Sequence, residues 1–289
     1  MAVLLDGKVV AAKVLAEATA RAERLHARGS SCGLAVVLVG NDPASEVYVR
    51  NKRRDCAKCG IETHDFDLPA TTTQEELEAL LDRLNRDERV SGILVQMPLP
   101  AHIDAQRAIQ HISPEKDVDG LHPVNLGRLV LGLPGPRPCT PAGVMRLLRE
   151  YDIDVAGKEV AVFGRSVLVG KPLLLMLTEA DATVTICHSK TPHKAETAQR
   201  ADVVISAIGR AKLVKADWMR EGAVVIDVGM NRDEDGRLCG DVDFAQVEPI
   251  ASAITPVPGG VGPMTRAMLM LNTVAAAERL AGLPGEWPR

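Results

Sequence analysis

A tyrosine and a lysine fall on one side of a predicted helix in the first third of the chain. Ser45, Tyr48 and Lys52 are spaced three and four residues apart, which places them on a common helix face. An aromatic ring can stack on a flat substrate, and an amine can move protons once desolvation or neighbouring cations lower its pKa. The segment carries several other cations, so a solvated basic helix with a half-buried tyrosine is the alternative.

Two further polar residues stand where predicted strands or turns end. Gln96 closes the apolar run GILVQ and precedes two prolines, and Asp119 stands in the segment DVDG. Ligands of open α/β sheets bind outside the carboxyl ends of the strands, where polar side chains line the site. The alternatives are structural, because Gln96 can cap its strand and Asp119 can close a turn by bonding to nearby backbone amides.

A glycine-containing turn follows a predicted strand in the second half of the chain. The segment KEVAVFGRSVLVGKPL runs from a β-branched strand through Gly164, Arg165, Ser166 and Gly170 into a helix pattern. Glycines let the backbone come close to a ligand, and free amides at a helix N-terminus attract a pyrophosphate. The spacing departs from G-x-G-x-x-G, so a tight turn beside a surface Arg165 is the alternative.

The residues after the next predicted strand indicate which dinucleotide would bind. An Asp or Glu at this point usually bonds the ribose hydroxyls of NAD, and none is present. Ser189 and Lys190, together with Arg165, offer a hydroxyl and two cations suited to a phosphate, so the sequence favours NADP over NAD. Gly209 and Gly229 follow two later strand patterns and add glycines to the same predicted sheet edge.

The elements that must position these residues alternate between strand and helix patterns. Strands are predicted over 34–40, 61–68, 92–96, 158–163, 182–187, 202–208 and 223–229. Thr73 and Glu76 form a capping-box pattern for a helix between the second and third strands. A stretch rich in Pro and Gly over 132–143 marks a boundary, and an apolar helix pattern covers 263–282. This alternation predicts two α/β domains with parallel sheets covered by helices.

Composition argues against several other classes of protein. A net charge of −4 and only seven aromatic residues disfavour a nucleic-acid partner, which needs basic surface or stacking rings. No apolar run reaches the length of a membrane span and the first residues do not form a signal peptide, so we expect a cytoplasmic protein without membrane contact. Cys56 and Cys59 form a lone CxxC without a second pair, so no metal site is expected.

Eight segments occur in an order found in one enzyme family. They are SEVYVRNKRRDCAKCGI, GILVQMPLP, KDVDGLHPVNLGRL, PCTPAGV, VFGRSVLVGKPL, TVTICHSKT, VIDVGMN and TPVPGGVGPMT. Each is weak alone, but together, over about residues 45–266, they resemble the bifunctional methylenetetrahydrofolate dehydrogenase/cyclohydrolases. The resemblance implies NADP-dependent oxidation of 5,10-methylenetetrahydrofolate to the methenyl compound, followed by its hydrolysis to 10-formyltetrahydrofolate.

The resemblance also implies roles for individual residues. Lys52 corresponds to the catalytic lysine, Gln96 to the glutamine that bonds and tunes it, and Tyr48 to the tyrosine that packs against the folate. Asp119 corresponds to the aspartate that binds the amino-pyrimidine edge of the pterin, since a carboxylate can accept two parallel hydrogen bonds. The remaining positions are matched to NADP contacts at Gly164, Arg165, Ser166, Ser189 and Met230, and to a substrate loop at Pro258, Gly259 and Gly260.

The family organisation implies two domains with a cleft between them and a homodimer in solution. We expect an N-terminal α/β catalytic, folate-binding domain over residues 1–140, joined by a C-terminal helix over about 265–289. A Rossmann-like NADP-binding domain is expected over 141–264, and the expected substrates are tetrahydrofolate derivatives. The alternative is another two-domain NADP-dependent dehydrogenase of the shikimate or amino-acid type, against which the combination of Lys52, Gln96 and Asp119 argues.

Overall fold

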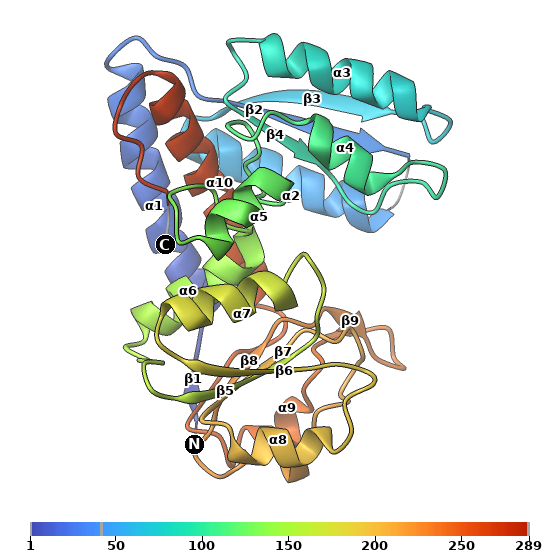
Figure 1. The fold of residues 1–289 in the computed structure, drawn as a ribbon, viewed down its shortest axis with the longest axis vertical. Helices are drawn as coiled ribbons and strands as arrows, with labels where there is room; N and C mark the ends of the chain where they lie inside the picture. The colour runs from blue at the N-terminus through green and yellow to red at the C-terminus, as the bar shows by residue number, and fades with distance from the viewer. Residues whose placement is uncertain (1, 41–42, 288–289) are drawn as a thin grey trace. The chain divides into compact units, whose positions relative to one another are not determined.

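The computed structural model describes residues 2–40 and 43–287, with the side chains of residues 43–48 outside the description. The chain forms two compact units, each built on its own parallel sheet (Figure 1). The three-stranded unit comprises Ala12–Arg137 and residues 266–287, and the six-stranded unit comprises residues 2–11 and Pro138–Thr265. The α/β class and the parallel sheets predicted from the sequence are therefore confirmed.

The first sheet has its most apolar strand in the centre. Its strands are β2 (Gly33–Val39), β3 (Glu62–Leu68) and β4 (Gly92–Val95), in the order β3-β2-β4. Val37 of β2 pairs with Phe66 on one side and Val95 on the other. Every residue of β2 is buried, as expected for a parallel strand covered on both faces. An isolated parallel bridge between Ile93 and Asp117 continues the sheet beyond β4.

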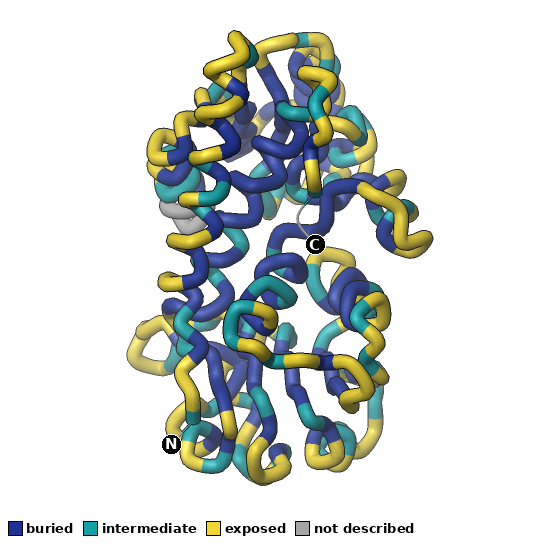
Figure 2. The backbone as a smooth tube through the Cα atoms, turned by 90° about the vertical axis from the view of Figure 1, so that its left-hand side faces the viewer, coloured by how far each residue is buried: buried dark blue, intermediate teal, exposed yellow. Residues whose placement is uncertain are grey.

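Helices cover both faces of this sheet, and the residues in the interior of the unit are buried (Figure 2). They include α2 (Pro43–Cys59), α3 (Gln74–Arg86) and α4 (Ala105–His111), and a further helix, α5 (Pro123–Val130), follows the DVDG segment. Val37 packs with Leu77 and Leu81 of α3 in one hydrophobic cluster, and α2 lies on the opposite face (Figure 1). Full burial of a leucine side chain contributes about 1.5–3 kcal/mol, so this cluster supplies much of the unit's stability.

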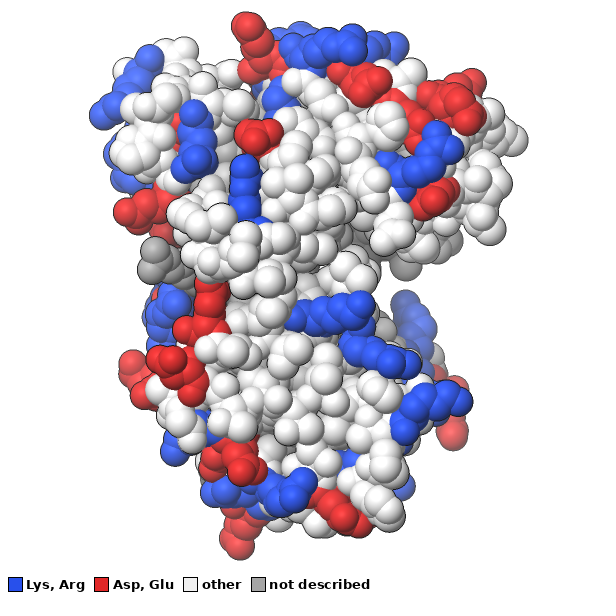
Figure 3. Space-filling model, in the orientation of Figure 1, with Lys and Arg blue, Asp and Glu red and all other residues white. Residues whose placement is uncertain are grey.

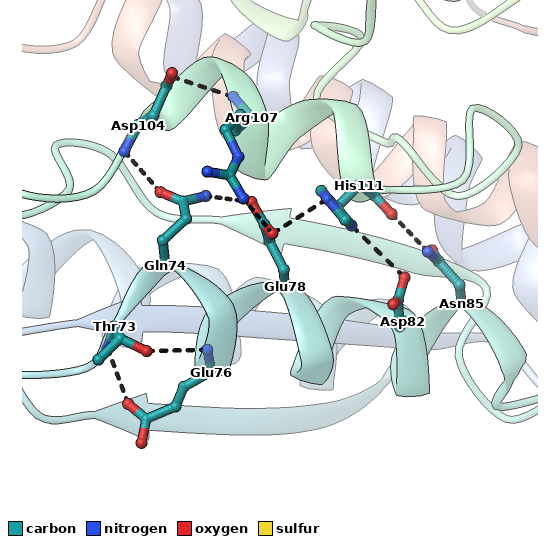
Figure 4. Close-up of polar contacts among 9 residues, drawn as sticks. All are labelled: Thr73, Gln74, Glu76, Glu78, Asp82, Asn85, Asp104, Arg107 and His111. Atoms are coloured by element: carbon teal, nitrogen blue, oxygen red, sulfur yellow. Dashed lines mark hydrogen bonds and ion pairs between the residues drawn. The ribbon is translucent and has the colours of Figure 1, made fainter.

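Polar contacts link α3 to α4, which pack on the same face of the sheet (Figure 4). Thr73 accepts from the Glu76 amide at 3.2 Å while the Glu76 carboxylate accepts from the Thr73 amide at 2.9 Å, which confirms the predicted capping box. Glu78, also on α3, accepts hydrogen bonds from Gln74 at 2.6 Å and from Arg107 of α4 at 2.8 Å. These bonds fix the helix pair that precedes the DVDG segment.

The second sheet is entirely parallel and reverses its strand order near the middle. Its strands are β1 (Val3–Leu4), β5 (Glu159–Phe163), β6 (Thr183–Cys187), β7 (Val203–Ser206), β8 (Val224–Asp227) and β11 (Ala253–Ile254). The order is β1-β11-β8-β7-β5-β6. From β5 the chain crosses to β6 on one side and then to β7 on the other. The carboxyl ends of β5 and β7 therefore form a topological switch point, where ligands of such sheets bind.

Short helices cover the two faces of the six-stranded sheet (Figure 1). They are α6 (Cys139–Glu150) and α7 (Gly170–Glu179) on one face, and α8 (Lys194–Arg200), η1 (Ala216–Trp218) and α9 (Phe244–Val247) on the other. The segment over residues 231–242 contains a two-stranded antiparallel hairpin, β9 (Asn231–Arg232) with β10 (Leu238–Cys239). This hairpin connects β8 to α9.

The first residues of the chain group with the later sheet, which differs from the expected boundaries. Leu4 of β1 pairs with Ile254 of β11, so residues 2–11 belong to the six-stranded unit rather than to a domain spanning 1–140. Two long helices, α1 (Gly7–His26) and α10 (Val261–Leu280), each contribute residues to both units. A two-residue strand whose partner is distant in sequence carries no local pattern, which is why sequence reasoning missed it.

The surface carries charges of both signs. Lys and Arg side chains are interspersed with Asp and Glu on the face shown in Figure 3, in keeping with the small net charge of −4. Among the helices of the described residues, none is both long enough and apolar enough to cross a bilayer.

Candidate active site

Lys52 and Gln96 meet at the carboxyl end of the three-stranded sheet. Gln96 directly follows β4, and its backbone amide donates to the Val37 carbonyl at 2.8 Å. Lys52, on α2, donates from Nζ to Gln96 Oε1 at 2.9 Å. The other end of the carboxamide donates to the Met97 carbonyl at 2.7 Å, which turns the amide oxygen toward the amine. Two residues selected separately from the sequence thus form one half-buried pair.

The DVDG turn uses one of its carboxylates for structure and leaves the other available. Asp117 is 2% exposed and accepts from the amides of Gly120, Leu121 and His122 and from the side chain of Asn125. Burial raises the pKa of Asp117, and these hydrogen bonds offset part of that effect. The turn considered for Asp119 is therefore closed by Asp117 instead.

Asp119 lies at the same sheet edge as Gln96. The bridge between Ile93 and Asp117 is parallel, so the chain from residue 117 to 119 runs in the direction of β4 toward its carboxyl end. Asp119 is half-buried, and within the described part of the chain no hydrogen bond engages its carboxylate. Lys52, Gln96 and Asp119 therefore bring an amine, an amide and a carboxylate to one edge.

The helix that carries Lys52 is anchored on two sides. Arg53 forms ion pairs with Asp65 at 2.9 Å and Asp67 at 3.2 Å, both on β3. The buried carboxylate of Asp55 pairs with Arg266 of α10 at 2.8 Å. The alternative of a freely solvated basic helix therefore does not hold for this part of α2. Tyr48 lies on the same helix, but its side chain is outside the described residues and its role stays a prediction.

A buried amide on the last helix supports the backbone beside Asp119. Asn272 is fully buried and donates to the Val118 carbonyl at 2.9 Å and to the Arg137 carbonyl at 3.1 Å. A polar side chain without partners in this position would cost about 1–3 kcal/mol. Asn272 therefore fixes the residue immediately before Asp119.

The glycine turn of the six-stranded unit needs glycine for reasons of space as well as conformation. Gly164 adopts φ +121°, and a Cβ there would lie 2.3 Å from the Ala207 carbonyl oxygen after β7. A Cβ on Gly170 would lie 2.1 Å from the Gly164 carbonyl oxygen. α7 begins at Gly170 without a side-chain cap, and the Lys171 amide donates to the Ser166 carbonyl at 3.0 Å, which holds the turn against the start of the helix.

Exposed polar side chains surround this turn. The Gly164 amide donates to the Cys187 carbonyl at 2.8 Å, so Arg165 and Ser189 leave from neighbouring strand ends. Both are exposed, as is Met230, at 47%. Ser166 Oγ accepts from the Val169 amide at 3.1 Å and thereby shapes the turn. The predicted dinucleotide residues therefore gather at the carboxyl edge around the switch point.

The predicted substrate loop packs on the start of the first helix. Gly259 and Gly260 are buried, and Pro258 is exposed. A Cβ on Gly7 would lie only 1.7 Å from the Gly260 carbonyl oxygen, and one on Gly259 would lie 3.2 Å from Lys8 Cε. These three loop residues belong to the six-stranded unit, whereas Lys52, Gln96 and Asp119 belong to the three-stranded unit.

The six cysteines are free and buried. Cys56 lies 3.4 Å from Met270 Sδ, and the Cys59 thiol donates to the Leu15 carbonyl at 3.7 Å. Burial raises the pKa of both thiols, which makes them poor nucleophiles and metal ligands. Over the described residues, no group of three or more His, Cys, Asp or Glu side chains could hold a metal ion.

Sequence reasoning missed four residues that shape these sites. Asp117 was overlooked in favour of Asp119, although both stand in the same short segment. Asn272 left a signal, since it is a polar residue in an otherwise apolar helix pattern. Lys8 and the buried Asp241, described below, left no local signal because their partners lie far away in sequence.

Two family models match the chain over most of its length. The tetrahydrofolate dehydrogenase/cyclohydrolase catalytic domain matches residues 5–119. The NAD(P)-binding domain of the same family matches residues 138–281. The two matches cover both the Lys52 site and the glycine turn.

Relatives extend this likeness over nearly the whole chain. The bifunctional protein FolD of Magnetococcus marinus is 58% identical over 280 residues, covering 96% of this chain and 98% of the relative. A crystal structure of the bifunctional FolD enzyme from Campylobacter jejuni superposes with a TM-score of 0.95 at 48% identity, covering 96% and 99%. A Trypanosoma brucei methylenetetrahydrofolate dehydrogenase-cyclohydrolase, solved with NADP and an inhibitor, gives 0.92 at 43% identity, covering 96% and 98%. The chain therefore belongs to the tetrahydrofolate dehydrogenase/cyclohydrolase family.

Proposed function

We propose that this chain oxidises 5,10-methylenetetrahydrofolate with NADP and hydrolyses the resulting methenyl compound to 10-formyltetrahydrofolate. The observation that carries the proposal is the 2.9 Å contact between Lys52 Nζ and Gln96 Oε1, in a chain of the matching family. Family membership decides against a dehydrogenase of the shikimate or amino-acid type.

Hydrolysis requires proton movements that Lys52 is placed to make. Water adds to the methenyl carbon and loses a proton, and the ring nitrogen that leaves the carbon must gain one. Lys52 accepts and returns these protons, while Gln96 holds the amine in one orientation through its fixed amide oxygen. A positioned acid or base of this kind accelerates a reaction by about 10²–10⁴-fold.

Binding of the folate is assigned to Asp119 and Tyr48. The Asp119 carboxylate is not used by the turn, so it is available to accept two parallel hydrogen bonds from the amino-pyrimidine edge of the pterin. Tyr48 lies one helical turn from Lys52 and would pack its ring against the flat substrate. Pro258, Gly259 and Gly260 are assigned to a substrate-contacting loop, supported by the tight packing of the two glycines.

The six-stranded unit fits NADP. The glycine turn at Gly164 lets a ligand come close to the backbone and so suits a pyrophosphate, while Arg165 and Ser189 would hold the ribose phosphate. Ser166 would shape the turn, and Met230 would contact the nicotinamide side. When bound, NADP supplies the hydride acceptor. The absence of an acidic residue between 188 and 191 supports NADP rather than NAD.

We further assign the folate and proton-transfer chemistry to the three-stranded unit and dinucleotide binding to the six-stranded unit. The functional boundaries then lie near residue 137 and near residue 265, where the compact units divide. A homodimer is supported by the exposed apolar residues Val3 and Leu4 on the edge strand β1. A cytoplasmic location is supported by six free cysteines, which suit a reducing compartment. Sedimentation would test the dimer.

The test is a spectrophotometric assay in two stages. Purified protein is mixed with 5,10-methylenetetrahydrofolate and either NADP or NAD, and reduced dinucleotide and methenyl absorbance are followed together. The proposal predicts turnover with NADP at a higher kcat/KM than with NAD, followed by decay of the methenyl signal. Absence of both reactions would overturn it.

A further inference from the structure

A buried carboxylate outside the residues assigned above connects two loops of the six-stranded unit. Asp241 follows the β9–β10 hairpin and is 0% exposed. Its oxygens accept five hydrogen bonds. Three come from backbone amides, those of Ile208 at 2.6 Å, Gly209 at 3.0 Å and Arg210 at 3.0 Å. The other two come from side chains, Ser206 Oγ at 3.0 Å and Asn231 Nδ2 at 2.9 Å. All five partners donate, so the group serves only as an acceptor.

These donors come from the carboxyl ends of two adjacent strands. Ser206 ends β7 and the three amides belong to the loop that follows it, whereas Asn231 lies beyond the end of β8. Gly229 packs directly on the carboxylate, because a Cβ there would lie 2.3 Å from Asp241 Oδ1. The backbone after β7 and the backbone after β8 are therefore both fixed against one side chain.

The loop held by Asp241 continues into the switch point. Ala207 precedes the three bonded amides, and its carbonyl oxygen lies against the α-carbon of Gly164. The Ala207 amide donates to the Phe163 carbonyl at 2.7 Å, at the end of β5. The residue that walls the glycine turn is therefore anchored to β5, and the part of the loop that Asp241 holds begins one residue later, at Ile208.

The strand order indicates which half of the dinucleotide this loop meets. The pyrophosphate lies at the turn after β5, and the phosphorylated ribose of the adenosine half lies at the end of β6. β7 and β8 are on the opposite side of β5. The nicotinamide half must therefore extend over the carboxyl ends of β7 and β8. Asp241 joins the loops that follow these two strands.

We propose that Asp241 is a positioning residue for the nicotinamide half of NADP. It acts through the backbone of Ile208, Gly209 and Arg210 and through the side chain of Asn231, without touching the ligand. The inference rests on the proposed function, since it takes NADP as the dinucleotide.

The test compares two ligands that share the adenosine half. Calorimetric titration of Asp241→Asn with NADP and with adenosine 2′,5′-bisphosphate separates the nicotinamide side from the β6 side. The amide group of Asn would face donors, so NADP affinity should fall by about 10–100-fold. Affinity for the bisphosphate should stay within about twofold, because Arg165 and Ser189 are not bonded to Asp241. Hydrolysis of methenyltetrahydrofolate without dinucleotide should keep its wild-type rate.

Two further variants keep the test decisive. Asp243→Asn makes the same chemical change two residues away, at the start of α9, and should leave both affinities unchanged. Ser206→Ala removes one of the five bonds from a small buried side chain, and should weaken NADP alone by about 3–10-fold. If Asp241→Asn does not fold, this milder variant carries the comparison.

The outcomes distinguish this inference from the proposed function. Equal losses of NADP and bisphosphate affinity, or no loss of either, would overturn the positioning role while leaving the enzyme assignment intact. A wild-type protein that binds the bisphosphate but shows no NADP turnover would instead overturn the proposed function, and this inference with it.

Discussion

The same tripeptide, Asp-Val-Asp, occurs once in each unit and is used differently. In both places the first aspartate is buried and accepts from three consecutive backbone amides. Asp117 bonds the amides that directly follow it, at residues 120–122, whereas Asp241 bonds amides 31 to 33 residues earlier in the chain. The second aspartates also differ, since Asp243 accepts from Gln246 Nε2 at 2.6 Å beside α9 and Asp119 has no such partner among the described residues.

The difference shows how a short motif acquires a function. Asp117 accepts from amides close to it in sequence, so it closes its own turn and leaves the next carboxylate available at a strand end. Asp241 accepts from amides distant in sequence and so joins two loops, and the next carboxylate, that of Asp243, caps α9. The residue suited to a ligand is therefore the one whose hydrogen bonds the fold has not already used.

The largest expected effect is on the stability of the three-stranded unit. Asp117→Ala leaves three buried amides and the Asn125 side chain without their acceptor, so the free energy of unfolding should fall by about 3 kcal/mol or more. Asp119→Ala is the matched change and should alter it by less than about 0.5 kcal/mol. Urea denaturation followed by circular dichroism measures both. Similar losses of unfolding free energy in the two variants would contradict the structural role given to Asp117 alone.

Ligand binding should show the reverse order for these aspartates. Asp119→Asn removes one charge and one acceptor from the proposed pterin contact, so folate affinity should fall by about 10–100-fold. Affinity for NADP should be unchanged, because the dinucleotide residues belong to the other unit. Titration of one variant with both ligands makes the comparison, and equal losses would contradict the pterin role.

The carboxylate beside Asp241 should make stability depend on pH. Burial, together with the charge of Asp241, raises the pKa of Asp227 to about 6, and hydrogen bonds from the amides of Val242, Asp241 and Gly229 offset part of the rise. A raised pKa means that the folded state holds a proton which the unfolded state has released. This contribution is fully present below about pH 4 and is lost as pH rises through about 6.

Asp227→Asn isolates that contribution. The unfolding free energy of the wild type minus that of the variant should fall by roughly 1–3 kcal/mol between pH 4 and 7. Only the wild type loses the contribution of the protonated Asp227. Guanidinium unfolding at several pH values measures it. A difference that stays constant over this range would show that Asp227 is charged in both states.

Much of the fold could be predicted because its signals are local. The β-branched run around Val36 and the capping box at Thr73 identify elements through residues that are neighbours in sequence. β1 was missed because two residues form it and its pairing depends on β11. The grouping of residues 2–11 with the later sheet follows from that pairing.

For the candidate sites, individual residues could be predicted from local patterns, but their contacts could not. Lys52 and Gln96 each have a local signal, but the 2.9 Å contact between them depends on how α2 packs against the sheet, which no local pattern reports. The wrong aspartate was considered for the DVDG turn, because Asp117 and Asp119 are both within reach of the glycine. Asp241 gave no signal, since its donors are set by the order of β7 and β8.

Whether Lys52 moves the protons of hydrolysis is tested by the rate at which Lys52→Met hydrolyses methenyltetrahydrofolate. Loss of absorbance is followed without dinucleotide, with Lys58→Met as the control because that lysine is exposed on the same helix. We expect a loss of at least about 100-fold for Lys52→Met, with NADP affinity retained and the control unchanged. Hydrolysis by Lys52→Met at the wild-type rate would contradict it.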